Sequence, residues 1–228
     1  MNYEPSENFW KSLYTRKEMM RKIVWNVESE EYFYTSAIKD GERVINALSL
    51  RDAKKTSIVL DFGCGIGRLL KYIQENTGLV MIGVDISHPM IEMAKKECEG
   101  LNDVHLSVML NSVIVPVESG LVDFVYSHIV LQHINKYKVF FILKEFSRVL
   151  KADGEGFIQL PNLIKCMNGY EKYAYDFVQF NDVQISAMNF WTKEEAELIL
   201  DQAGLEVTSI TEEDTDLFIK FKKKELIK

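Results

Sequence analysis

The stretch IVLDFGCGIGR, residues 58–68, joins an apolar run to a turn with three glycines, and the rest of the chain is interpreted from it. Its first three residues are typical of a short buried strand, and apolar residues recur at helical spacing directly after it. Gly63, Gly65 and Gly67 allow a ligand to approach the main chain closely, because a Cβ at such positions would collide with it. The stretch therefore predicts a strand, a ligand-binding turn and a helix.

The pattern of a strand followed by a helix repeats along the chain. Residues 79–84 are a second apolar run, and Ser87 before Pro89 predicts the start of the next helix. Strands that alternate with helices are typical of a parallel sheet covered on both faces. The sequence therefore predicts an α/β fold with a doubly wound, mostly parallel sheet. The other elements expected are strands at 104–108, 122–127 and 156–160 and a helix at 137–150.

The C-terminal part predicts a capped helix followed by two strands. Thr192 and Glu195 form a capping box, and Gly204 ends the helix. Residues 205–210 then predict a strand, and residues 217–221 predict its antiparallel partner.

Two aromatic-rich segments, residues 1–56 and 163–190, lie outside this alternation of strands and helices. The first is expected to be an N-terminal helical extension or lid, ahead of a main domain at residues 57–228. The second is expected to be an insertion on the substrate side of that domain. Their aromatic side chains have two open interpretations, extra core beneath peripheral helices or a lid that faces the substrate.

Composition and charge argue against several classes of protein. The 34 acidic and 27 basic residues give a net charge of −7, which lacks the basic footprint of a nucleic-acid binder. The three cysteines are far apart and indicate neither a disulfide framework nor a metal site, which favours a reducing compartment. No stretch approaches the ~20 apolar residues of a membrane span. We expect a cytoplasmic protein with a small-molecule substrate and no nucleic-acid, membrane or metal partner.

The glycine spacing argues against a dinucleotide ligand. The fingerprint GxGxxG would place glycine or alanine where Arg68 stands, and Gly67 comes one position too early. Asp61 would repel a pyrophosphate but suits an ammonium or sulfonium group. Asp85, at the end of the second strand, can accept hydrogen bonds from both ribose hydroxyls, or it can cap the next helix together with Ser87. The pattern favours a cationic nucleoside.

Four motifs in order resemble those of a known family. VLDFGCGIGR at 59–68 looks like the first motif of the class I S-adenosylmethionine-dependent methyltransferases, and GVDIS at 83–87 is similar to the second. Residues 123–134 resemble the motif of the fourth strand, and residues 148–154 resemble the turn before the fifth. The resemblance is to small bacterial-type enzymes, and it implies a Rossmann-like fold with a seven-stranded sheet and S-adenosylmethionine as the cofactor.

The resemblance also implies individual contacts with this cofactor. Asp85 would hold the ribose, Ile86 would lie on the adenine, and the Ser127 carbonyl would accept from the ammonium group. Asn111 has two interpretations, an amide contact with the adenine or a turn residue. Arg68 likewise has two, contact with the methionine carboxylate or a solvated helix residue. The cofactor-binding residues predicted are Asp61, Gly63, Cys64, Gly65, Asp85, Ile86, Asn111 and Ser127.

Two histidines are the catalytic candidates. Methyl transfer from a sulfonium is an in-line displacement, so positioning and exclusion of water supply much of the acceleration. A hydroxyl acceptor must still lose a proton, and histidine suits that role. His128 and His133 follow the fourth predicted strand, on the side expected for the transferred methyl group. They would act as base or orienting group, although ordinary hydrogen-bonded positions at the core edge also explain them.

These patterns support one main hypothesis and two others. The main one is a methyltransferase that acts on an oxygen or nitrogen of a small molecule, such as a sugar, a natural-product intermediate or a surface-glycan precursor. A noncatalytic S-adenosylmethionine-binding protein that regulates or scaffolds a partner is the alternative. A nicotinamide-dependent oxidoreductase is disfavoured by the glycine spacing.

Overall fold

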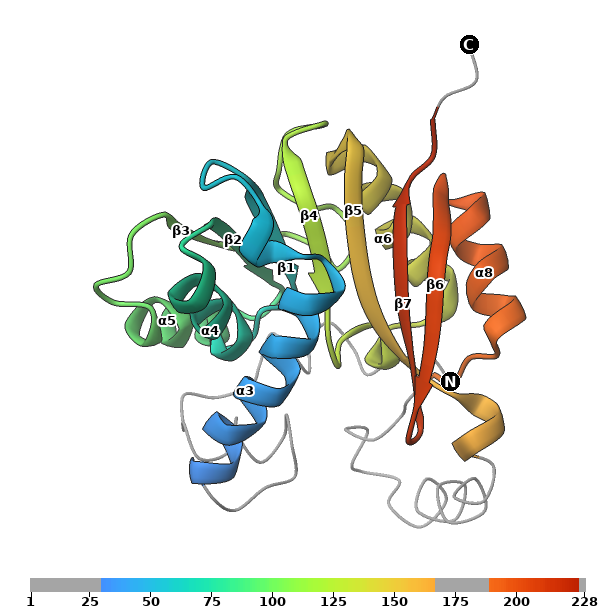
Figure 1. The fold of residues 1–228 in the computed structure, drawn as a ribbon, viewed down its shortest axis with the longest axis horizontal. Helices are drawn as coiled ribbons and strands as arrows, with labels where there is room; N and C mark the ends of the chain where they lie inside the picture. The colour runs from blue at the N-terminus through green and yellow to red at the C-terminus, as the bar shows by residue number, and fades with distance from the viewer. Residues whose placement is uncertain (1–29, 167–188, 226–228) are drawn as a thin grey trace.

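The computed structural model describes residues 30–166 and 189–225 (Figure 1). Within these ranges the strands are β1 (Ile58–Phe62), β2 (Val80–Asp85), β3 (Val104–Val108), β4 (Val122–Ser127), β5 (Leu150–Pro161), β6 (Leu205–Glu213) and β7 (Asp216–Lys223). The helices are α3 (Glu30–Ala47), η1 (Leu50–Asp52), α4 (Arg68–Thr77), α5 (His88–Glu97), η2 (Leu131–His133), α6 (Lys136–Val149) and α8 (Lys193–Gln202). The alternation of strands and helices expected from the sequence is therefore confirmed.

The described strands form one seven-stranded sheet in the order β3-β2-β1-β4-β5-β7-β6. Strands β1 to β5 pair in parallel, and β7 runs antiparallel to both β5 and β6. The doubly wound, mostly parallel sheet is confirmed, as is the antiparallel C-terminal pair. Because β1 lies between β2 and β4, the chain winds outward in both directions from this strand. Ligands bind such sheets outside the carboxyl ends of the strands at this reversal point.

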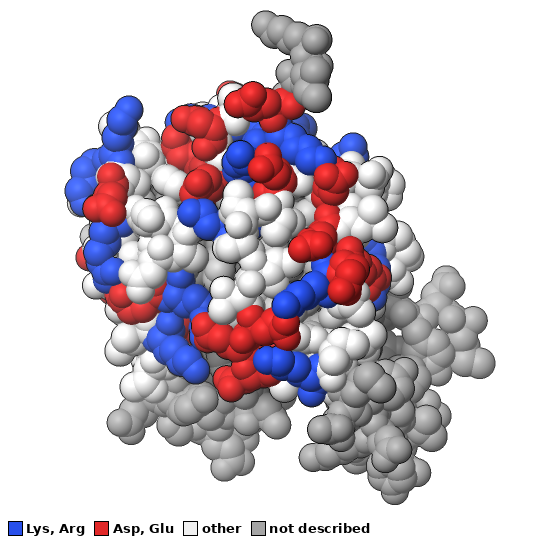
Figure 2. Space-filling view, turned by 45° about the vertical axis from the view of Figure 1, so that its right-hand side comes forward, with Lys and Arg blue, Asp and Glu red and all other residues white. Residues whose placement is uncertain are grey.

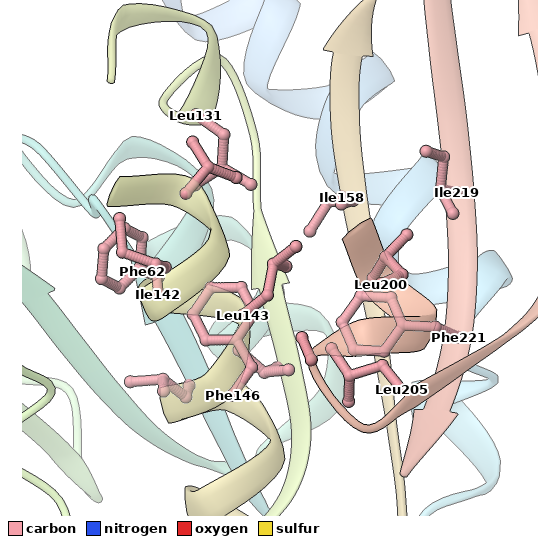
Figure 3. Close-up of a cluster of buried hydrophobic side chains, with 14 of the residues drawn as sticks. Phe62, Leu131, Ile142, Leu143, Phe146, Ile158, Leu200, Leu205, Ile219 and Phe221 are labelled. Atoms are coloured by element: carbon pink, nitrogen blue, oxygen red, sulfur yellow. The ribbon is translucent and has the colours of Figure 1, made fainter. Parts of the chain in front are cut away.

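Helices cover both faces of the sheet and bury a core on each (Figure 1). On one face α6 and α8 lie over β4, β5 and β7, and Figure 3 shows the side chains that fill this layer. Phe62 of β1 and Phe146 of α6 meet edge to face, with ring centroids 5.2 Å apart. Burial of a side chain such as Phe146 stabilises the fold by roughly 1.5–3 kcal/mol. This core fixes the end of β1, from which the glycine turn departs.

On the other face, α3 lies against α4 and brings the N-terminal part of the chain to the sheet (Figure 1). Ala37, Val44 and Ile45 of α3 are buried in the same core as Leu70 of α4. Gly41 lets the two helices approach, because a Cβ there would lie 2.3 Å from the Tyr72 ring. The lid predicted in the two aromatic-rich segments falls mostly on residues 1–29 and 167–188, which lie outside the described residues.

The fifth strand begins earlier than the sequence predicts. Leu150, expected as the last helical residue, starts β5 and pairs with Val122. The next pair joins Phe124 to Glu155, so the intervening residues of β5 form an irregular, bulged stretch. Of the turn expected at residues 148–154, the first two residues end α6 and the other five lie within β5.

Membrane-spanning helices and metal-binding clusters were sought among the described residues. No helix among them is long and apolar enough to cross a membrane. In the same part of the chain, His, Cys, Asp and Glu side chains do not gather in groups of three or more that could hold a metal ion.

Candidate active site

The segment that joins the end of β1 to the first residue of α4, residues 61–68, is called the donor loop below. Gly63, Gly65 and Gly67 have φ values of 79°, 54° and 81°. Residues other than glycine adopt this left-handed backbone conformation only at a cost in free energy. The backbone N–H of Gly63 donates to the Val84 carbonyl at 2.8 Å, which ties the donor loop to β2. A Cβ at Gly63 would lie 2.4 Å from a methyl group of Val130. Glycine is therefore required at position 63 for two reasons: the positive φ and the lack of room for a Cβ beside Val130.

The carboxylate of Asp85 organises the same end of the sheet. One oxygen accepts from the Gly65 N–H at 2.9 Å, and the other accepts from the Ser87 N–H at 2.8 Å. Burial raises the pKa of Asp85, while these backbone hydrogen bonds oppose the shift. Each oxygen keeps lone-pair capacity for a ligand hydroxyl. Ser87 precedes α5 as its N-cap residue, but its hydroxyl makes no side-chain cap, and its N–H donates to Asp85.

Asp61 lies at the carboxyl end of β1 and is 4% exposed. Burial raises its pKa to about 7, and the neighbouring charge of Asp85 adds to the shift against the opposing effects of Tyr126 and Arg68. Two carboxyl groups close together in a buried site favour a ligand that carries positive charge. The electrostatics of the donor loop therefore agree with the cationic nucleoside inferred from the sequence.

The segment after β4, residues 128–135, is called the acceptor loop below. Its residue Ile129 has φ of 60°, which is an outlier for a β-branched side chain. The side-chain oxygen of Gln159 on β5 accepts from the Ile129 N–H at 3.0 Å and holds this conformation. Gln159 also donates to Gln132 at 3.3 Å and to Asp216 at 2.5 Å. The acceptor loop is thus fixed by a buried polar residue of the neighbouring strand.

The acceptor loop carries both candidate histidines, in different surroundings. The His128 side chain is 6% exposed, and its Nε2 lies 3.4 Å from an oxygen of Asp40. Neither of its ring nitrogens has a hydrogen-bond partner in the described part of the chain. Burial lowers the pKa of His133 to about 4, and its Nε2 lies 3.2 Å from the Gln132 amide nitrogen. His133 is therefore neutral at pH 7, and His128 stands beside a carboxylate.

One cavity brings most of the predicted residues together. It is lined by the donor loop, by the end of β2 and by the acceptor loop. Asn111 and Ser127 are not in its lining: the Asn111 amide oxygen accepts from two backbone N–H groups, and the Ser127 hydroxyl donates to the Phe62 carbonyl. Their cofactor contacts stay predictions. The predicted residues that line the cavity are Asp61, Gly63, Cys64, Gly65, Asp85, Ile86, His128 and His133.

The structure adds residues that the sequence does not single out. The cavity lining also includes Met90, Met109, Ser112 and Lys138. Their spacing along the chain is that of ordinary helix and loop residues, so no local signal marks them. Arg68 also lines the cavity, with a side chain only 7% exposed that donates to Asp40 at 3.2 Å. The solvated interpretation of Arg68 is therefore wrong.

The lining fits a nucleoside that carries an amino-acid tail. At Gly65 a Cβ would meet no atom within 4 Å, so the main chain there is open to a ligand. The Asp85 carboxylate can take the ribose hydroxyls, and Ile86, Met90 and Met109 offer apolar surface for a base. The buried carboxyl of Asp61 suits the cationic end of the ligand. These residues would hold S-adenosylmethionine, as the motifs imply.

Comparisons with known proteins agree with this site. A family model described as a methyltransferase domain matches residues 59–154. Phosphoethanolamine N-methyltransferase 3 of Arabidopsis thaliana is 27% identical over 207 residues, which cover 88% of this chain and 38% of that protein. An 18S rRNA (guanine-N(7))-methyltransferase of Schizosaccharomyces pombe is 35% identical over 109 residues, which cover 46% of this chain and 40% of that protein. The chain thus spans about two fifths of these relatives' length.

A solved structure shares the fold. The SAM-dependent methyltransferase of Aquifex aeolicus superposes with a TM-score of 0.61 at 21% identity, covering 81% of this chain and 89% of that one. This likeness confirms the expected fold, and the matching family model agrees with the methyltransferase motifs of the donor loop. The chain has the fold of the class I S-adenosylmethionine-dependent methyltransferases, and the methyltransferase-domain model matches its residues 59–154.

Proposed function

We propose that this chain transfers the methyl group of S-adenosylmethionine to an oxygen or nitrogen atom of a small molecule. The observation that carries the proposal is that one cavity joins the donor loop to two buried imidazoles. Bound there, the cofactor supplies a methyl group already activated by its sulfonium. The residues of the chain then need only to orient the acceptor, exclude water and receive a proton.

The two histidines take different roles in this proposal. An oxygen of Asp40 lies 3.4 Å from Nε2 of His128 and holds this imidazole in the cavity wall, where it would receive the acceptor's proton. His133, whose pKa burial lowers to about 4, is a weak base and serves to orient the acceptor. The imidazole of His128 is therefore the general base that we propose.

Surface charge supports a small acceptor. The net charge is −7, and Figure 2 shows a face on which acidic and basic side chains are interspersed without a continuous basic surface. Polyanion binders concentrate lysine and arginine on the face that contacts phosphates. The Schizosaccharomyces pombe relative is named for an rRNA substrate, so the experiment must also test RNA as an acceptor.

The test uses the purified chain with cofactor labelled in its transferable methyl group. Phosphoethanolamine, named for the Arabidopsis relative, is the first acceptor to try, followed by other amines, sugars and total cellular RNA. Label in a small molecule, with release of the demethylated cofactor, is the expected result. Label in RNA alone would contradict the proposal, and cofactor binding without transfer to any fraction would favour the noncatalytic alternative.

A further inference from the structure

The cavity wall holds a positive charge that works against a cationic ligand. Asp61 and Asp85 supply the negative charge that suits a sulfonium, but Arg68 lines the same cavity. The side chain of Arg68 is 7% exposed, so water screens its charge poorly. Arg68 also acts electrostatically on Asp61 and lowers its pKa, which shows that the two charges interact. A negative charge paired with this arginine would therefore favour a cation in the cavity.

Asp40 of α3 is placed to neutralise it. One oxygen of Asp40 accepts from both terminal nitrogens of Arg68, each at 3.2 Å. The same oxygen lies 3.4 Å from Nε2 of His128, and the other lies 3.6 Å from Arg43. Asp40 is 5% exposed. Burial raises its pKa, but His128 and Arg68 outweigh that effect and hold it below its usual value.

Asp40 is not part of the cavity lining, whereas Arg68 and His128 both are. Among the described residues, Arg68 and His128 are the side chains that connect it to the cavity. A single buried carboxylate that pairs with two cavity residues fixes the position of both and sets the charge of the wall.

We infer that Asp40 is a positioning residue that neutralises Arg68 and orients His128, so that the cavity selects the sulfonium cofactor over its demethylated product, whose sulfur carries no charge. The inference rests on the proposed placement of the cofactor in this cavity. It makes α3, which precedes the motifs of the family, part of the active site. Removing the charge of Asp40 would take one negative charge from the side chains beside the cavity and so weaken its attraction for the sulfonium.

The test is calorimetric titration of Asp40→Asn with S-adenosylmethionine and with its demethylated product. The two ligands differ by one methyl group and one positive charge, so the ratio of their affinities reports the charge of the wall. We expect Asp40→Asn to weaken the sulfonium ligand about tenfold and the product less than about threefold. A purely structural role would lower the thermal midpoint and leave this ratio unchanged.

Glu42→Gln is the matched control. Glu42 lies two residues along the same helix and accepts from Tyr72 of α4 at 2.9 Å, as Asp40 accepts from Arg68 of α4. It pairs with Arg51 and is not in the cavity lining. The substitution Glu42→Gln therefore removes a carboxylate that anchors α3 to α4 without changing the charge of the cavity wall. A ratio in Asp40→Asn equal to that of wild type and of Glu42→Gln would overturn the inference.

If Asp40→Asn alone fails to fold, the comparison is made in an Arg68→Gln background. Removing both partners of a buried ion pair is tolerated better than removing one. The double variant loses one charge of each sign, so its ratio is expected to stay within about threefold of that of wild type, and a shift of about tenfold would overturn the role through Arg68. Both ligands are titrated without an acceptor. Failure of methyl transfer would therefore refute the proposed function while leaving this inference standing, and an unchanged ratio in Asp40→Asn would do the reverse.

Discussion

The donor loop and the acceptor loop face each other across one cavity but are built in different ways. The donor loop uses backbone N–H groups, glycine conformations and a carboxylate that follows it closely in sequence. The acceptor loop holds a non-glycine residue at positive φ and depends on Gln159 of β5 and Asp40 of α3. The donor loop is thus held mainly by backbone hydrogen bonds and glycine conformations, whereas the acceptor loop is held by side chains of β5 and α3. The predictions below probe that difference.

The largest effect is expected in the donor loop, for Gly63→Ala. The new Cβ would lie 2.4 Å and 2.6 Å from the methyl groups of Val130, at a φ of 79°. Strain and overpacking together should lower the free energy of unfolding by about 3 kcal/mol. Displacement of the loop by about 1 Å should weaken cofactor binding about hundredfold. Chemical denaturation and calorimetry measure the two effects.

Gly100→Ala is the control for this substitution. Gly100 has φ of 84°, but a Cβ there would meet no atom within 4 Å. It should therefore lose only the conformational part, about 1 kcal/mol, and bind the cofactor normally. If both variants lost equal stability and neither lost affinity, close approach in the donor loop would not be what binding requires.

A second prediction separates the histidines of the acceptor loop. His128→Asn should lower kcat about hundredfold, the usual contribution of a general base, and leave cofactor affinity nearly unchanged. His133→Asn should act more on the KM of the acceptor, since burial lowers its pKa to about 4 and makes it a poor base. His105→Asn, at an exposed position on β3, is the control expected to match wild type. A greater loss of kcat for His133 than for His128 would reverse the assignment.

The same contrast explains what the sequence could and could not predict. Strand, glycine turn and helix follow from local patterns, and so do the positions of Asp61 and Asp85, because each ends a strand. The roles of Asp40 and Gln159 do not follow, since each contacts residues far along the chain. Asn111 shows that a residue's role can stay undecided even when its position in a motif is known. Its amide oxygen accepts from two backbone N–H groups of its own turn, and the spacing of the motif does not predict these hydrogen bonds.

A third prediction concerns pH and the donor loop. Burial raises the pKa of Asp61 to about 7, so below that pH the free site holds a protonated carboxyl that a cation must ionise. Binding should then release a proton, and affinity should fall about tenfold between pH 7.5 and 5.5. Stability of the ligand-free protein runs the other way, because this residue's contribution is present at acidic pH and lost as the pH rises toward 7.

Calorimetry in two buffers of different ionisation enthalpy detects the released proton. Asp61→Asn, which carries no ionisable group, should bind more weakly at pH 7.5 and lose this pH dependence. A slope that persists in Asp61→Asn would assign the proton to another group of the site.

The smallest effect is expected at Ile129, where the acceptor loop is strained. Ile129→Gly removes a β-branched residue from φ of 60°, a gain of about 1–2 kcal/mol that the backbone freedom of glycine reduces by about half. Stability should therefore change by less than about 1 kcal/mol, while kcat falls about threefold because the loop that carries His128 is held less firmly. Asp103→Gly, at φ of 58° in the turn before β3, is the matched variant expected to keep its rate. If kcat of Ile129→Gly stayed at the wild-type value, as expected for Asp103→Gly, the strained backbone at Ile129 would not contribute to catalysis. The donor loop and the acceptor loop would then differ only in the contacts that anchor them.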